Sequence, residues 1–96
     1  MTTPVKWGSP VEVERKNRIK LSVAAYAYEF EDDPIMSDHA FDDLAKQIDV
    51  RMDTGNETLD AFFRKHFEAY TGSWVHNHPD IPGLQRIYHM IKDKRK

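Results

Sequence analysis

The sequence predicts an all-α protein, a compact four-helix single domain over residues 1–96 with flexible ends at 1–9 and 95–96. Apolar residues recur at helical spacing in four segments, which we expect to be helices near 10–31, 38–52, 57–70 and 81–94. The single candidate strand is Ser73–His76, which is too short to argue for a sheet. The length is that of one domain.

The 10–31 helix has the clearest start. Residues 9–12 read Ser-Pro-Val-Glu, which supplies an N-cap, a proline at the first helical position and a capping-box glutamate. Asp32 and Asp33 come directly before Pro34. Because proline disfavours the helical conformation of the residue that precedes it, we expect the helix to end there. Its expected buried stripe consists of Ile19, Val23, Tyr26, Ala27 and Phe30.

Each of the other helices also has a start signal and an apolar stripe. Ser37 is the expected N-cap of the 38–52 helix, Asn56 or Thr58 caps the 57–70 helix, and Asp80 or Ile81 opens the last. Gly72 ends the third helix. The residues expected to face the core are Phe41, Leu44, Ala45 and Ile48, then Leu59, Phe62, Phe63, Phe67 and Tyr70, then Leu84, Ile87, Tyr88 and Ile91.

Composition narrows the class of protein. The chain has no cysteine, which excludes disulfides, thiolate zinc sites and cysteine nucleophiles and fits a reducing compartment. The first residues lack an apolar signal core, and no apolar run approaches the roughly 20 residues that a membrane span needs. We therefore expect a soluble cytoplasmic protein that does not bind membranes.

Charge is unevenly distributed although the net charge is only −2. Residues 29–49 carry eight carboxylates against one lysine. Four of these acidic residues lie at the end of the 10–31 helix, where they oppose the helix dipole, so a role facing a partner is worth considering. The expected partner surface consists of Glu29, Glu31, Asp32, Asp33, Asp38, Asp42 and Asp43.

Basic residues gather near both ends of the chain, where they could contact phosphate in a weak nucleic-acid interaction. The alternative interpretation is that they form solvated helix faces and a solubilising tail. These residues are Arg15, Lys16, Arg18 and Lys20, and then Lys92, Lys94, Arg95 and Lys96.

A second group of residues has the side chains of a metal site. His76, His78 and Asp80, joined by His89, offer imidazole and carboxylate ligands of the kind that zinc binds. The competing interpretation is that His78 anchors a turn before Pro79, and we expect no metal or cofactor. Trp74 beside Gly72 either closes the core or stacks on a partner.

Residues 26–47, YAYEFEDDPIMSDHAFDDLAKQ, carry a family resemblance. This segment resembles the N-terminal helical hairpin of NAD-dependent DNA ligases, which captures the nicotinamide mononucleotide half of NAD. Glu29 stands where that family has a histidine, and Phe41 stands where it has a tyrosine. The positions that match the family pattern are Tyr28, Pro34, Ser37, Asp38, Asp42 and Leu44.

The resemblance implies that Tyr28, Asp38, Phe41 and Asp42 surround a nicotinamide riboside. Catalysis by the ligase route needs a lysine in a K-x-D-G setting, which the chain lacks, as it lacks a P-loop and a G-x-S-x-G elbow. We therefore expect no enzyme. Small proteins with this hairpin followed by T-G-x-W and H-P resemble those of tailed phages or prophages.

The leading hypothesis is a non-catalytic accessory or regulatory protein that is encoded by a phage. It would bind a protein partner, such as a nucleic-acid enzyme, through the acidic surface of the hairpin, where a carboxylate-rich face can mimic DNA. The alternatives are a binder of NAD or nicotinamide mononucleotide, and a weak nucleic-acid binder.

Overall fold

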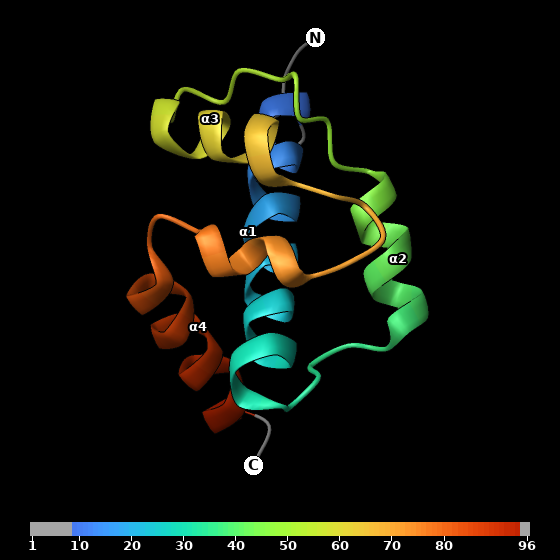
Figure 1. The fold of residues 1–96 in the computed structure, drawn as a ribbon, viewed down its shortest axis with the longest axis vertical. Coiled ribbons are helices and arrows are strands. Elements are labelled where there is room, and N and C mark those ends of the chain that lie inside the picture. Colours follow the sequence, from blue (N-terminus) through green and yellow to red (C-terminus); the bar gives the residue numbers. More distant parts are fainter. Residues whose placement is uncertain (1–8, 95–96) are drawn as a thin grey trace, which may run out of the picture.

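The computed structural model describes residues 9–94, and every regular element in that range is helical (Figure 1). The α-helices are α1 (Pro10–Glu31), α2 (Asp38–Lys46), α3 (Glu57–His66) and α4 (Ile81–Lys94), and a short 3-10 helix, η2 (Ser73–Asn77), lies between the last two. The predicted all-α, four-helix architecture is confirmed. Of the ends predicted to be flexible, only Ser9 belongs to the described residues.

Helix α1 is the central element of the fold. It begins as predicted, because the Ser9 Oγ accepts a hydrogen bond from the Glu12 backbone N–H at 3.2 Å. Helices α2 and α4 lie on opposite sides of α1, and η2 crosses its front (Figure 1). With neighbours on three sides, α1 is buried without a break from Leu21 to Ala27. The two outer members of its predicted stripe are wrong, since Ile19 is 49% exposed and Phe30 is 43% exposed.

The acidic end of α1 is held by tyrosine hydroxyls and by its backbone. Asp32 adopts the left-handed conformation, with φ 51°, and its N–H donates to the Ala27 carbonyl. The Tyr26 hydroxyl donates to Glu31, and the Tyr88 hydroxyl of α4 donates to Asp33 at 2.7 Å. Two of the carboxylates that oppose the helix dipole therefore have structural partners.

Helix α2 is shorter than predicted, because it ends at Lys46 and not near residue 52. The N–H of Asp49 donates to the Glu14 carboxylate at 3.0 Å, and the Asp49 carbonyl accepts from Arg18 Nη2 at 2.7 Å. Side chains of α1 thus satisfy backbone groups that a longer helix would pair within itself. Residues 47–56 form a loop anchored on α1.

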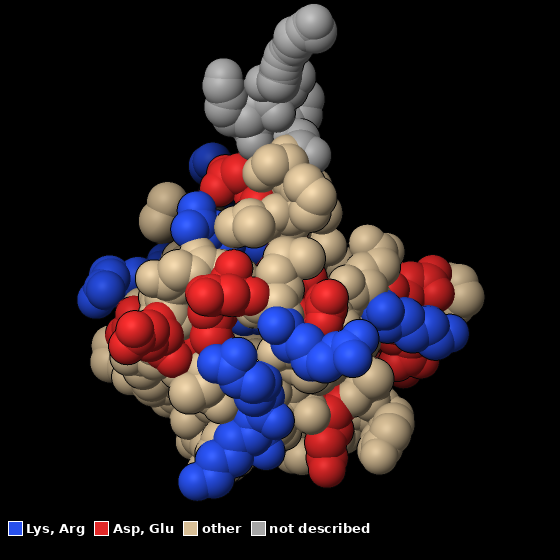
Figure 2. All heavy atoms as spheres, turned by 90° about the horizontal axis from the view of Figure 1, so that it is seen from above, with Lys and Arg blue, Asp and Glu red and all other residues tan. Residues whose placement is uncertain are grey.

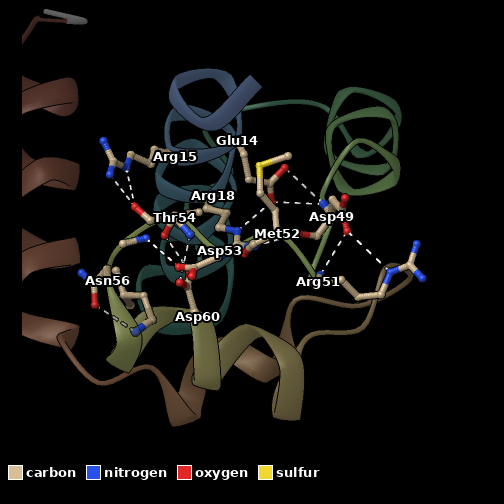
Figure 3. A network of polar contacts seen from close by, with 12 residues as sticks. Glu14, Arg15, Arg18, Asp49, Arg51, Met52, Asp53, Thr54, Asn56 and Asp60 are labelled. Atoms are coloured by element: carbon tan, nitrogen blue, oxygen red, sulfur yellow. Dashed lines mark hydrogen bonds and ion pairs between the residues drawn. The ribbon is translucent and has the colours of Figure 1, made fainter. Parts of the chain in front are cut away.

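The loop is fixed by a buried polar network (Figure 3). Arg18 Nε donates to Glu14 at 2.6 Å, and its Nη1 donates to Asp60 of α3 at 2.8 Å. Asp60 also accepts from the backbone N–H and the hydroxyl of Thr54. All of these side chains are buried. Each charged group among them has a hydrogen-bonding partner, as buried charges need.

Helix α3 also ends earlier than predicted, at His66, with Phe67 as its C-cap. Phe62 and Phe63 are buried as expected, and both rings pack near Trp74, which is itself buried. Trp74 therefore closes the core. The candidate strand at Ser73–His76 is wrong, because those residues belong to the 3-10 helix η2.

Candidate functional site

A pocket of about 370 Å³ opens between the C-terminal half of α1, the turn at 34–36, α2 and residues 70–72. The segment between α3 and η2 reaches over to α2 before it returns across α1, which brings residues distant in sequence to one site (Figure 1). We call this site the acidic pocket, because three of the residues that line it are carboxylates.

Small and apolar side chains line the inner part of the acidic pocket. Ala24 and Ala25 of α1 are buried, and Gly72 lies against them. A Cβ atom at Gly72 would lie 3.4 Å from the Ala25 Cβ and 3.5 Å from the Phe41 Cζ, which are ordinary packing distances, so residue 72 lies between α1 and α2. Ile35 adds a half-buried apolar side chain.

Glu29, Asp38 and Asp42 supply the negative charge of the pocket. Asp38 and Asp42 lie four residues apart on α2, so they share one face of the helix and repel each other. Within residues 9–94 neither carboxylate has a hydrogen bond or an ion pair. Glu29 differs, because its Oε1 lies 2.9 Å from His76 Nε2 of η2. The pocket therefore holds two carboxylates that pair with no described residue and one that is positioned by a histidine.

Three aromatic rings also line the pocket: Tyr28 of α1, Phe41 of α2 and Tyr70. Tyr28 is 56% exposed and Tyr70 is 83% exposed. The prediction that Tyr70 faces the core is wrong, because α3 has already ended four residues earlier and the chain turns toward α2. Large rings this exposed are available to a ligand.

The four residues that the ligase resemblance assigns to a nicotinamide site all line this one pocket. They are Tyr28, Asp38, Phe41 and Asp42. The sequence did not identify Tyr70 or Gly72 as neighbours of these residues. The only available signal was the Thr71-Gly72 break, which ends the helical pattern beside Tyr70.

The acidic surface predicted for a partner is divided in the structure. Glu29, Asp38 and Asp42 line the pocket, whereas the other members do not. Asp43 lies 3.3 Å from His39 Nε2, and Asp32 is exposed at the helix end.

Glu31 and Asp33 accept hydrogen bonds from the hydroxyls of two buried tyrosines, Tyr26 and Tyr88. Burial, followed by the hydrogen bond to Glu31, raises the pKa of Tyr26 to about 12. The hydrogen bond to Asp33 is the main cause that raises the pKa of Tyr88 above its ordinary value. Both tyrosines are therefore held in the protonated form that donates to these carboxylates.

The candidate metal ligands do not converge. Within residues 9–94 no group of three or more histidine, aspartate or glutamate side chains is placed to hold a metal ion. His76 contacts Glu29, and its ring lies 4.7 Å from that of Phe30. His78 Nδ1 accepts a hydrogen bond from the Asp80 N–H, and partial burial lowers the pKa of His78. His78 thus anchors a turn.

The basic residues of α1 do not form a continuous phosphate-binding face. Arg18 is buried in the polar network, and Arg15 Nε donates to the Thr54 carbonyl at 3.0 Å. Viewed from the end of the molecule where α1 begins, lysine and arginine side chains lie interspersed with acidic ones (Figure 2). At the other end of the chain, Arg95 and Lys96 lie outside the described residues.

Comparison with protein-family models, characterised proteins and solved structures finds no match to this chain. The resemblance to the ligase hairpin therefore depends on residues 26–47 alone. No helix in the described range 9–94 combines the length and the apolar character needed to cross a membrane.

Proposed function

We propose that this chain is a non-catalytic accessory protein that binds a protein partner at the acidic pocket. The observation that carries the proposal is that some charged and aromatic groups around the pocket are exposed and unpaired within the described chain. Asp38 and Asp42 are exposed carboxylates without a partner in the described chain, and Tyr28 and Tyr70 are exposed rings beside them.

The charge of the pocket indicates a basic segment as the ligand. Three carboxylates in one concave site attract cations and repel anions, and the field is stronger in a concavity than on a flat surface. Charge complementarity of this kind speeds the encounter with a basic partner and discourages acidic ones. This proposal keeps the acidic hairpin as the binding surface but confines the contact to Glu29, Asp38 and Asp42.

The test is a selection from a displayed library of random peptides. The parent chain is compared with the Asp38→Asn/Asp42→Asn variant and with Asp32→Asn/Asp43→Asn, which removes the same charge outside the pocket. We expect basic peptides to be enriched by the parent and by the second variant, and to be lost with the first. Their association should slow as salt is added. The same peptides enriched by all three proteins would overturn the proposal.

A second candidate function is the binding of nicotinamide mononucleotide, because the four residues that the resemblance assigns to that ligand share the pocket. The carboxylates would repel its phosphate, which ranks this candidate lower. If it is right, nicotinamide mononucleotide should shift the NMR signals of Tyr28, Asp38 and Phe41, and Phe41→Tyr should tighten the binding. Saturable micromolar binding that Asp42→Ala abolishes would place this function first.

We propose a cytoplasmic location, which the absence of cysteine fits. That location would be the host cytoplasm if the chain is encoded by a phage, an origin that rests on the resemblance alone.

A further inference from the structure

We infer that the acidic pocket takes one arginine side chain of the partner. This inference rests on the proposed function and specifies its chemistry. An arginine side chain has an apolar stem and a planar cationic end. The pocket has a matching division between its inner surface and its exposed groups.

The inner surface suits the apolar stem. Ala24, Ala25 and Gly72 are small, and Ile35 and Met36 are apolar and half-buried. Long cationic side chains bury their methylene groups on such surfaces while the charged end stays near polar groups. At about 370 Å³ the pocket has room for a side chain of this length.

The exposed groups suit the planar end. Tyr28 and Tyr70 line the pocket with exposed rings, and the face of such a ring attracts a guanidinium through cation–π contact and stacking. Asp38 and Asp42 lie one helical turn apart, so one guanidinium, with five N–H donors in a flat fork, can donate to both. The contact would satisfy both carboxylates and relieve their mutual repulsion.

Lysine fits these observations less well. Its ammonium is compact and strongly hydrated, and it cannot donate in a plane to two carboxylates while it stacks on a ring. The pocket is open to solvent on the side of Tyr28 and Tyr70, so an ammonium would keep most of its water there. We therefore expect discrimination between the two basic residues and not merely attraction of positive charge.

The experiment uses two blocked pentapeptides, acetyl-Gly-Gly-Arg-Gly-Gly-amide and the same peptide with lysine, titrated by NMR into the full chain. We expect the arginine peptide to bind about two- to fivefold more tightly, which is the size of an exposed cation–π contact. Chemical-shift changes should be concentrated in residues 24–42 and 70–72. The Asp42→Asn variant should weaken the arginine peptide, whereas its neighbour Asp43→Asn, outside the pocket, should not.

The ring contribution is tested separately with Tyr70→Leu, which the fold tolerates because Tyr70 is 83% exposed. We expect this variant to lower the preference for arginine, because one of the two rings is gone while Tyr28 and the carboxylates of Asp38 and Asp42 remain. Equal binding by the parent, or a preference for arginine that is undiminished in Tyr70→Leu, would overturn the inference.

The outcomes also separate the inference from the proposed function. If both peptides bind equally to the parent and both are lost with Asp42→Asn, the acidic pocket binds basic partners but does not select arginine. If Asp42→Asn and Asp43→Asn weaken binding equally, only the general charge of α2 acts, and both proposals fail. A parent chain that shows no shift with either peptide would likewise overturn both.

Discussion

Arg18 and Asp60 form a buried ion pair that joins α1 to α3, with Nη1 2.8 Å from Oδ1. The Arg18 guanidinium also lies 4.9 Å from the centre of the Phe63 ring. Arg18 therefore contacts α3 through an ion pair with Asp60 and a cation–π contact with Phe63. Such a buried pair costs desolvation energy, which hydrogen bonds from its other neighbours must offset. Glu14, Thr54 and the Asp49 carbonyl supply those bonds.

Removal of the Asp60 carboxylate should be strongly destabilising. In Asp60→Ala the Arg18 charge loses one of its two buried counter-ions, and the Thr54 N–H loses its acceptor. We expect the free energy of unfolding to fall by about 3–5 kcal/mol, measured by urea unfolding. Glu68→Ala removes the same charge from an exposed site and should change stability by less than about 0.5 kcal/mol. Equal effects would mean that the network is not energetically important.

Lowering the pH should reduce the stability that this network contributes. Burial alone would raise the pKa of the Asp60 carboxyl, but hydrogen bonds from Thr54 and Arg18 outweigh it and hold the pKa below its ordinary value. A lowered pKa gives stability that is present above the unfolded value near 3.9 and is lost as pH falls through the folded value. We expect the stability difference between the parent and Asp60→Asn to shrink below about pH 4. A difference that stays constant with pH would show that Asp60 does not titrate with folding.

Alkali should act through Tyr26. Its pKa is raised to about 12, so the stability linked to its protonated hydroxyl is complete below the unfolded value near 10 and is lost as pH rises through 12. Tyr26→Phe should lack this alkaline loss and should cost about 1 kcal/mol near neutral pH, because the hydrogen bond to Glu31 is gone. Unfolding curves at several pH values measure both effects. Tyr28→Phe is the control, since Tyr28 is exposed.

The aromatic core should depend on Phe63. Its side chain is 2% exposed, and its ring lies 5.5 Å from that of Trp74 and 5.3 Å from that of Phe62. We expect Phe63→Ala to remove about 3–5 kcal/mol, which would unfold a domain of this size. Phe30→Ala, at a ring that is 43% exposed, should cost about 1 kcal/mol. Thermal melting by circular dichroism compares them, and similar melting temperatures for the parent and Phe63→Ala would show that α3 is not central.

The starts of the helices were predictable from the sequence, because capping is a local interaction. Ser9 and Ser37 each accept a hydrogen bond from a backbone N–H three residues ahead, as predicted, and Asn56, one of the two candidates for the third helix, does the same. The ends of α2 and α3 were not predictable. The loop after α2 is held by Glu14 and Arg18, which lie more than 30 residues earlier in the chain, and no local pattern records that contact.

The candidate site shows the same division. The resemblance identified Tyr28, Asp38, Phe41 and Asp42, and the structure brings them to one pocket. The resemblance covers residues 26–47 and so does not include Tyr70. The helical spacing assigned the Tyr70 ring to the core. The charge pattern assigned Glu31 and Asp33 to a partner surface. Glu31 instead accepts from Tyr26 of the same helix, and Asp33 accepts from Tyr88, a contact that is apparent only once α1 and α4 are packed together.

The unequal burial of α1 and α2 has a consequence for local opening. Helix α1 buries a continuous run of residues, whereas α2 has nine residues and fully buries only Ala45. Backbone amides of α1 near Ala25 should exchange with deuterium only when the whole domain unfolds, while those of α2 should exchange through local opening. The wall of the acidic pocket that carries Asp38 and Asp42 is then less stable toward local opening than the wall formed by α1. A ligand in the pocket should slow exchange in α2 far more than in α1.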